Sequence, residues 1–301
     1  MKQFPNIITA EEREHWITAG KITAEVREWS KSLFKPGVKL VDIANAIENK
    51  IKEKGAVPAF PVNLSLNEAA AHYTPIKDDL IILKDQIIKV DIGVCYEGAI
   101  GDTAYTVDLS GKYSKLVEAS EKALENAAKI LKIGVTLGEI GKVIEDTILS
   151  YGFEPVRNLS GHGMALFTIH TSPSLPNYNT GEKTQLQKGM IIALEPFATT
   201  GVGRIKDSGN IVIYEPIEHR PIRSPIAREI AKEIESLPKV PFARRWLDEK
   251  FGTNKVSLAL QLLKANGNIT SHPELVEVEK GMVSQAEHTF LIEEKVICLT
   301  Q

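Results

Sequence analysis

Long apolar runs and cysteines are both scarce in this sequence of 301 residues. No apolar run approaches the roughly 18–20 residues that a membrane-spanning helix needs. The two cysteines, Cys95 and Cys298, are too few for a disulfide framework and are typical of a protein from a reducing compartment. Thr9 and Glu12 form a capping-box pattern, so the N-terminus predicts a helix rather than a signal peptide. We therefore expect a cytoplasmic protein without a membrane anchor.

An excess of one charge is also missing. The chain has 36 Lys and Arg against 39 Asp and Glu, and its net charge is −3. A dedicated DNA-binding or anionic-membrane protein would usually be strongly basic, so we expect no specific DNA and no membrane partner. The 43% hydrophobic and 25% charged residues are ordinary values for a globular domain, and we expect a monomer.

An internal repeat is present in the first two thirds of the chain. Residues 36–40 resemble residues 133–137, an offset of 97, and each stretch is followed by an amphipathic helix pattern that stops at a glycine. The same offset relates Ile43 to Ile140, Ile47 to Ile144, Glu48 to Glu145, Ile51 to Ile148, Gly55 to Gly152 and Pro58 to Pro155.

The repeat continues into residues that carry chemistry. His72 is matched by His170 at an offset of 98. Apolar runs that each follow a turn then end on a carboxylate three times, at Asp91, Glu195 and Glu287. The order of helix, loop with histidine and strand with carboxylate thus occurs twice. It predicts an α+β domain with pseudo-two-fold symmetry, in which strands from both halves face a shared site.

The carboxylates in these apolar runs are candidate metal ligands. A buried carboxylate is costly unless it is paired or bound to a cation. Asp102 follows Asp91 by eleven residues across the turn at 96–98, so a β-hairpin would place both side chains on one inner face. Each carboxylate alone could be a strand-end salt bridge, but Asp91, Glu195 and Glu287 share one repeated frame. Several converging carboxylates would repel one another without a cation.

One histidine completes the candidate set. His162 lies between glycines in residues 160–163, where the backbone can pass close to a site. Four carboxylates and one imidazole suit two divalent metals such as Mn, Fe(II), Co or Zn, and the imidazole argues against a pure Ca or Mg site. Bridging carboxylates can hold two such ions about 3.5–4 Å apart.

The motifs around these residues resemble methionine aminopeptidases over nearly the whole chain. The motifs are Asp91-Ile92-Gly93, Gly101-Asp102-Thr103, Ser160-Gly161-His162, Leu194-Glu195-Pro196 and Gln285-Ala286-Glu287-His288-Thr289. Residues 60–75 look like the type 2 subfamily in particular. The resemblance implies the pita-bread fold, an antiparallel sheet covered by helices, and removal of the initiator methionine from nascent proteins.

The resemblance also implies roles for individual residues. Asp91, Asp102, His162, Glu195 and Glu287 would hold two metals that activate a shared water molecule, with Asp102 and Glu287 bridging. Glu195 would also shuttle the proton. Two further histidines would contact the substrate, His170 at the oxyanion and His72 near the scissile nitrogen, and two apolar residues would line the methionine pocket, Phe60 and Ile169.

The interval of 92 residues from Glu195 to Glu287 is longer than one hairpin requires. In type 2 enzymes a helical insertion occupies it. Helical patterns at 226–234 and 257–263 fit such an insertion here, and prolines at 216, 221 and 225 mark its start. We therefore predict a catalytic domain at 1–215 and 274–301, with an inserted helical, winged-helix-like subdomain at 216–273.

The insertion is basic, with ten Lys and Arg against five Asp and Glu between residues 219 and 264. This charge could mean only a solvated helical face, and the alternative is a transient contact with the ribosome.

Two rival functions remain open. The first is an Xaa-Pro peptidase of the same fold, which would carry another histidine four residues before His162, where this chain has Asn158. The second is a non-catalytic pita-bread protein that binds RNA or ribosomes, which would have lost metal ligands that are all in place here.

Overall fold

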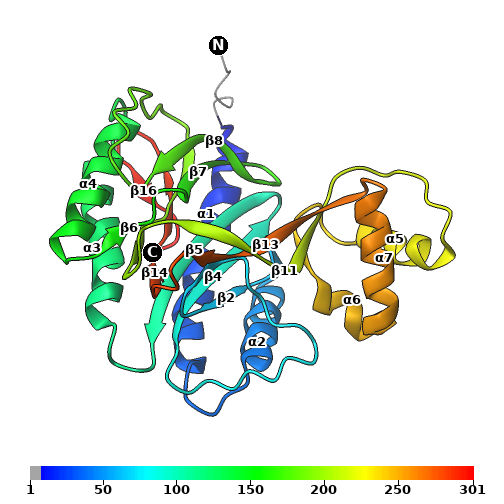
Figure 1. Cartoon of the computed structure of the whole chain (residues 1–301). Coiled ribbons are helices and arrows are strands. Elements are labelled where there is room, and N and C mark those ends of the chain that lie inside the picture. The colour runs from blue at the N-terminus through cyan, green and yellow to red at the C-terminus, as the bar shows by residue number, and fades with distance from the viewer. Residues whose placement is uncertain (1–7) are drawn as a thin grey trace.

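The computed structural model describes residues 8–301 and shows helices that cover antiparallel strands on the outside (Figure 1). None of the helices in this range is long and apolar enough to cross a membrane. The helices are α1 (Ala10–Ser30), the 3-10 helix η1 (Lys31–Leu33), α2 (Leu40–Glu53), α3 (Ser114–Ile130), α4 (Leu137–Ser150), α5 (Pro225–Ser236), α6 (Arg244–Phe251) and α7 (Thr253–Ala265).

Most of the strands are short, with two to six residues. The strands are β1 (Val57–Pro58), β2 (Asn63–Leu66), β3 (Ala69–Ala71), β4 (Ile87–Tyr96), β5 (Ala99–Asp108), β6 (Glu154–Pro155), β7 (Ser160–Ala165), β8 (Thr168–Pro176), β9 (Ile191–Leu194), β10 (Phe197–Thr199), β11 (Ile205–Pro216), β12 (Phe242–Ala243), β13 (Ile269–Glu277), β14 (Val283–Gln285), β15 (His288–Leu291) and β16 (Ile297–Cys298).

Helix α1 begins where the sequence predicts. The Thr9 hydroxyl accepts a hydrogen bond from the Glu12 N–H at 3.1 Å, and the Glu12 carboxylate accepts one from the Thr9 N–H at 2.7 Å. This reciprocal capping box satisfies two N–H groups that the start of a helix otherwise leaves free. Trp16 and Val26 on the inner face of α1 are buried, so the cap fixes the start of a helix that packs on the strands.

The predicted repeat is confirmed by the positions of α2 and α4. Both helices have 14 residues, and their bounds differ by 97 at each end. Each is followed by a two-residue strand, β1 or β6, that pairs antiparallel with a strand of its own half, β4 or β10. The two halves therefore repeat one helix-and-strand unit.

Four sheets carry the strands, and all the pairings among the described strands are antiparallel. Strands β1, β2 and β5 pair with β4, and β15, β9, β7 and β8 are neighbours in the five-stranded sheet with β16. A bridge between Ala104 and Glu287 joins β5 to the turn between β14 and β15. The two halves thus meet where the predicted metal ligands lie.

The β4–β5 hairpin confirms the predicted arrangement of Asp91 and Asp102, with one difference. Gly93 lies opposite Asp102 and Asp91 lies opposite Ala104, so the two aspartates are two positions apart along one face. However, β4 continues to Tyr96 and does not end on Asp91, whereas Glu195 directly follows β9. The expectation of three strand-end carboxylates is therefore wrong for Asp91, because its strand is the first arm of a long hairpin.

The segment between β11 and β13 lies beside the main body in Figure 1 and is built from α5, α6 and α7. Its buried apolar side chains, among them Ile230, Phe242, Leu247 and Leu260, form a separate core. The sequence pattern anticipates α5 and α7 but not α6. That helix has only eight residues, and charged side chains fill most of its first five positions.

Candidate metal centre

The five predicted ligands come from distant parts of the chain and approach one another at the junction of the two halves. Asp91 is on β4, Asp102 on β5 and His162 on β7. Glu195 directly follows β9, and Glu287 is the second residue after β14. All five line one cavity of about 240 Å³. The hairpin, the repeat and the third copy of the strand pattern thus bring the predicted residues to a single site.

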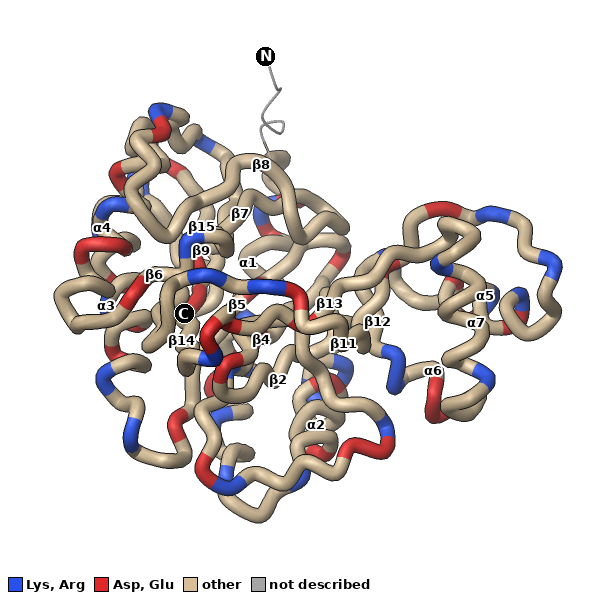
Figure 2. The backbone as a smooth tube through the Cα atoms, viewed as in Figure 1, with Lys and Arg blue, Asp and Glu red and all other residues tan. Residues whose placement is uncertain are grey.

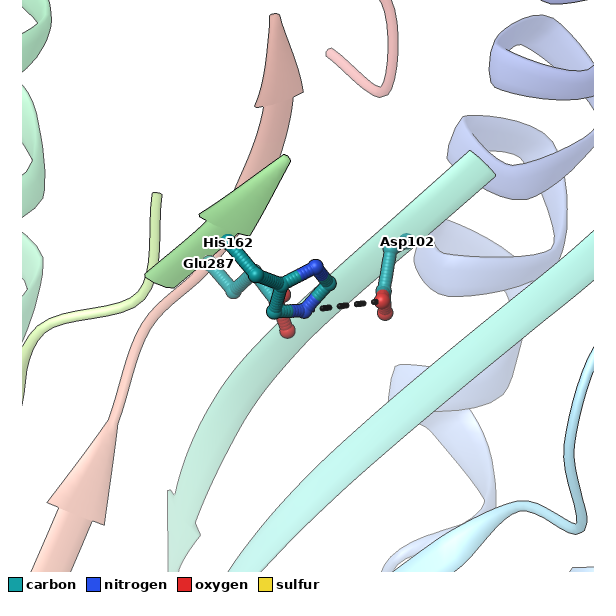
Figure 3. A group of neighbouring side chains, drawn as sticks. All are labelled: Asp102, His162 and Glu287. Carbon is teal, nitrogen blue, oxygen red and sulfur yellow. Dashed lines mark ion pairs between the residues drawn. The ribbon is translucent and has the colours of Figure 1, made fainter. Parts of the chain in front are cut away.

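Three of these residues already have a metal-binding spacing. One ligand atom each of Asp102, His162 and Glu287 lies within 4.8 Å of the other two (Figure 3). His162 Nε2 is 3.8 Å from Asp102 Oδ2 and 3.7 Å from Glu195 Oε1. Glu195 therefore faces the same imidazole nitrogen from another strand.

The geometry of His162 presents Nε2 to the carboxylates. Its Nδ1 lies 3.2 Å from the Gly163 carbonyl oxygen, which can only accept, so Nδ1 carries the proton and Nε2 is free to bind a cation. The neighbouring Gly161 has no room for a side chain, because a Cβ there would lie 2.4 Å from the Ala193 carbonyl oxygen. Glycine is thus required where β7 passes β9.

Two of the carboxylates are buried, Asp91 and Glu195 are half-buried, and the protein alone satisfies them only in part. Asp102 is 3% exposed and Glu287 is 2% exposed. Among the described residues, the Oδ1 atoms of Asp91 and Asp102 have no hydrogen-bond partner, while Glu195 accepts one from Gln285 Nε2 at 3.3 Å. Buried carboxylate oxygens without partners are costly, and a cation between them would offset that cost.

Burial also controls how these groups ionise in the protein alone. It raises the pKa of Asp102 to about 7. Burial first, and neighbouring carboxylates second, raise the pKa of Asp91, Glu195 and Glu287 well above their usual ranges. Burial and the nearby His170 lower the pKa of His162 to about 3. The imidazole is therefore neutral, as a metal ligand must be, and the carboxylates need a positive partner to ionise together.

The side chains of this cavity fit divalent metal ions. The donor set is four carboxylates and a neutral imidazole nitrogen, three of the five residues are buried and two half-buried, and the set includes oxygens without a hydrogen-bond partner among the described residues. Such a set suits Mn, Fe(II), Co or Zn.

The two other predicted histidines also line the cavity. The His170 ring centroid is 4.4 Å from that of His162, at an interplanar angle of 70°. His72 has a φ of +63°, which is uncommon for a residue with a side chain. Burial lowers the pKa of both rings, that of His72 to about 4, with His272 as the next cause in each case. Both rings are therefore neutral at pH 7.

The remaining cavity walls include the two predicted pocket residues, Phe60 and Ile169, which are 9% and 8% exposed. Gly93 lies against the Phe60 ring, since a Cβ there would be 2.3 Å from Phe60 Cε1. The cavity is thus apolar on the side of these residues and polar around the carboxylates.

Sequence reasoning missed several residues that the structure places in the cavity wall. His272 on β13 donates a 2.9 Å hydrogen bond from Nε2 to the carboxylate of Glu215 on β11, and its ring lies 5.7 Å from that of His72. Nothing local in the sequence marks this pair, because it forms across two strands. Gln285 had a usable signal, since it lies two positions before Glu287 and so on the same face of an extended chain.

Comparisons with known proteins agree with this geometry. The model of metallopeptidase family M24 matches residues 14–219. A methionine aminopeptidase of Archaeoglobus fulgidus is 43% identical over 94% of this chain and 96% of its own length, and one of Methanocaldococcus jannaschii is 44% identical over 95% and 97%. This chain belongs to the methionine aminopeptidases of metallopeptidase family M24.

Solved structures confirm the fold that this family implies. A methionine aminopeptidase from Thermotoga maritima superposes with a TM-score of 0.73 at 25% identity and covers 99% of this chain and 100% of its own. A thermophilic Arx1 superposes with a TM-score of 0.84 at 14% identity and covers 97% of this chain and 91% of its own. The pita-bread prediction is therefore confirmed; the likeness to Arx1 concerns the fold alone.

Proposed function

We propose that this protein is a metal-dependent aminopeptidase that removes the initiator methionine from nascent polypeptides. One observation carries the proposal: four carboxylates, each buried or half-buried, and a neutral histidine meet in one cavity of a chain that is 43–44% identical to methionine aminopeptidases over almost its whole length. The family supplies the reaction, and the cavity supplies residues able to perform it.

In this proposal two divalent metal ions would be held by Asp91, Asp102, His162, Glu195 and Glu287, with Asp102 and Glu287 as the shared ligands. The unpartnered oxygens of the two aspartates and the approach of Glu195 and Asp102 to His162 Nε2 support it. When bound, such ions polarise a carbonyl and lower the pKa of water. The identity of the metal follows from cellular supply as well as from ligand type.

The side chains around the ligands orient the peptide and move the proton. Glu195, held by Gln285, shuttles the proton towards the leaving amine. His170, a neutral ring against His162, donates a hydrogen bond to the oxygen of the scissile carbonyl. His72 binds near the scissile nitrogen from the opposite half of the repeat. Each role uses a ring or carboxylate that faces the same cavity.

Selectivity for methionine comes from the apolar wall. Phe60 and Ile169 provide a pocket for an unbranched thioether. One methylene in such a pocket is worth only about 1–3 kcal/mol, so some cleavage after leucine or norleucine is expected.

We assign the chain to the type 2 subfamily, with an inserted winged-helix-like subdomain at 216–273 and the catalytic domain at 1–215 and 274–301. The separate apolar core of α5–α7 supports this division. Cytoplasmic action is consistent with the two free thiols, Cys95 and Cys298.

A transient ribosome contact through the insertion is the finer part of the proposal. Basic residues are spread along this segment in Figure 2. Within residues 8–301, five of the Lys and Arg in this segment form no ion pair, namely Arg223, Arg228, Lys232, Lys239 and Lys264, whereas Lys250 and Lys255 pair with glutamates.

Asn158 argues against the rival Xaa-Pro peptidase. Its side chain donates to the Ile205 carbonyl at 2.7 Å and accepts from the Ile205 N–H at 2.9 Å, so this cavity residue holds β11 in place. A histidine there would have neither this pair of bonds nor the same shape.

Peptide hydrolysis by the purified, metal-loaded protein tests the proposal. We expect release of methionine from Met-Ala-Ser, weaker release of leucine from Leu-Ala-Ser, and none of the first residue from Ala-Pro-Ser. Preferential cleavage of Ala-Pro-Ser would support the Xaa-Pro peptidase. No cleavage of any peptide by protein with bound metal would favour the non-catalytic binding protein.

A further inference from the structure

A fully buried arginine ties the inserted segment to the main body. Arg245 on α6 donates from Nη2 to the carboxylate of Glu48 on α2, and its side chain has no exposed surface. It also donates from Nη1 to Thr74 Oγ1 at 2.6 Å and to the Pro75 carbonyl at 3.3 Å, and from Nε to Asn45 Oδ1 at 3.2 Å. One guanidinium therefore connects three segments that are distant in sequence.

The Glu48 carboxylate also accepts hydrogen bonds from groups other than Arg245. Its Oε2 accepts from Trp246 Nε1 at 2.7 Å, and its Oε1 accepts from the Val62 N–H at 3.2 Å. The Arg245–Glu48 clamp, meaning these two side chains and their hydrogen bonds, thus satisfies both charges inside the protein. Two adjacent residues of α6, Arg245 and Trp246, hold the same carboxylate.

The clamp contacts two segments that each contribute residues to the cavity wall, and one of them pairs with the strand of Asp91. Val62 lies between Phe60 and Asn63, which both line the cavity, and Thr74 follows His72 by two residues. A bond of 2.7 Å from the Leu64 N–H to the Tyr73 carbonyl joins the two segments directly. The clamp therefore fixes both ends of one small wall.

His72 needs such support, because its backbone is in the left-handed region at a φ of +63°. A residue with a side chain stays in that region only where its surroundings hold it. The bonds that follow His72 most closely are those of Tyr73 and Thr74, and the second of these belongs to the clamp. The ring itself has its Nδ1 3.3 Å from the Pro273 carbonyl oxygen of β13, so Arg245 acts on the backbone directly after His72 rather than on the ring.

The insertion itself contributes a residue to the cavity wall close to the clamp. Pro241 lines the cavity four residues before Arg245, and the intervening strand β12 pairs with β11. The insertion is thus a wall of the cavity as well as a separate apolar core.

Stability alone does not account for this pair. Replacing a buried ion pair with apolar side chains of similar size is often neutral or stabilising. What apolar side chains cannot supply is a set of directed hydrogen bonds to Thr74, Pro75 and Val62. The polar clamp therefore determines where these backbone segments lie.

We propose that Arg245, paired with Glu48, is a positioning residue through which the insertion sets the place of His72 against the substrate. This inference rests on the proposed function for the role of His72, but the position of the ring can be measured without activity.

A double-mutant cycle tests the coupling. Arg245→Met is combined with Glu48→Leu, so that no buried charge is left unpaired. We expect kcat/KM for Met-Ala-Ser to fall at least tenfold, with bound metal unchanged. In a His72→Ala background the same pair of substitutions should cause less than a twofold further loss, because its effect passes through His72. An additive loss in that background, or parental kcat/KM in the paired variant, would overturn the inference.

Two controls separate this effect from loosening of the insertion. Arg244→Ala removes bonds to Asp248, Thr253 and Ser257 that lie within the insertion, and kcat/KM should stay near that of the parent.

Histidine ring NMR then measures the position of the His72 ring directly. The His72 resonance should shift in the paired variant while that of His15 on α1 does not. An unmoved His72 resonance contradicts the inference, whereas an inactive parent whose His72 still moves in the variant contradicts only the proposed function.

Discussion

At the scale of single residues, glycines shape this site because they let neighbouring groups pack closely. Gly161 lets β7 pass β9 closely enough to bring His162 to the carboxylates, and Gly93 leaves room for the Phe60 ring at the cavity wall. The Gly163 carbonyl accepts a hydrogen bond from His162 Nδ1, so the proton stays on Nδ1 and Nε2 faces the carboxylates. Small residues beside the ligands thus decide where the functional atoms lie.

Gly93→Ala should therefore impair substrate binding. The new methyl group would lie 2.3 Å from Phe60 Cε1, so the ring must move within the pocket. We expect KM for Met-Ala-Ser to rise by about tenfold, the scale of one misfitted group in an apolar pocket, with metal content unchanged. Steady-state kinetics check this, and adding Phe60→Leu should recover part of the loss. An unchanged KM would show that Phe60 does not contact the substrate.

At the scale of elements, much of the arrangement could be predicted from the sequence. The capping box located the start of α1, the offset of 97 located α2 and α4, and the turn after Tyr96 located the hairpin with both aspartates. These signals are local or repeated. Local patterns do not specify α6, because its place depends on Arg245 reaching Glu48 almost 200 residues away in sequence.

The same limit applies to the cavity wall. The His272–Glu215 pair forms between two strands whose register is interrupted by irregularities. No pattern along the chain reveals such a register. The cavity carboxylates could be selected from the sequence because each one interrupts an apolar run, whereas His272 and Glu215 have no such signal before their strands pair.

The cap of α1 provides a prediction about one element. Thr9→Ala removes the hydroxyl that accepts from the Glu12 N–H. We expect the free energy of unfolding to fall by about 1 kcal/mol, with kcat/KM unchanged because α1 packs outside the cavity. Urea denaturation of the metal-bound protein measures the first and peptide hydrolysis the second. No loss of stability would mean that the capping box does not act in solution.

At the scale of the whole molecule, the candidate metal centre lies where the two halves meet. β5 belongs to the first half of the chain and the Glu287 turn to its C-terminal part, and the two are bridged at Ala104. His162 on β7 and Glu195 after β9 lie at the same junction. Bound metal ions would hold these elements together, since a ligand that binds only the folded state stabilises that state.

Chelation should therefore lower the thermal midpoint, and more at pH 8 than at pH 5.5. Without metal, the folded-state pKa of Asp102 is about 7, and those of Asp91, Glu195 and Glu287 are also raised. A carboxyl group with a raised pKa in the folded state stabilises the metal-free folded form when it is protonated. This stabilisation is complete below about pH 4, the pKa of such a group in the unfolded chain, and it is lost as the pH rises through the folded-state pKa. Metal at about 100 times its Kd would restore about 2.7 kcal/mol.

Differential scanning calorimetry with and without chelator, at both pH values, measures this difference. Asp102→Asn should respond less to chelator at pH 8, because one carboxylate of the set is neutral. An equal effect of chelator at the two pH values would contradict the account of how these carboxylates ionise.

The most direct test of the central claim is methionine release by chelated protein after reconstitution with Mn, Fe(II), Co or Zn. The substrates are Met-Ala-Ser and its N-acetyl form, and the control is Asp102→Asn. The account predicts metal-dependent release from the free peptide only, falling at least about 100-fold in the control. Bound metal without release, or equal release from the acetylated peptide, would contradict it.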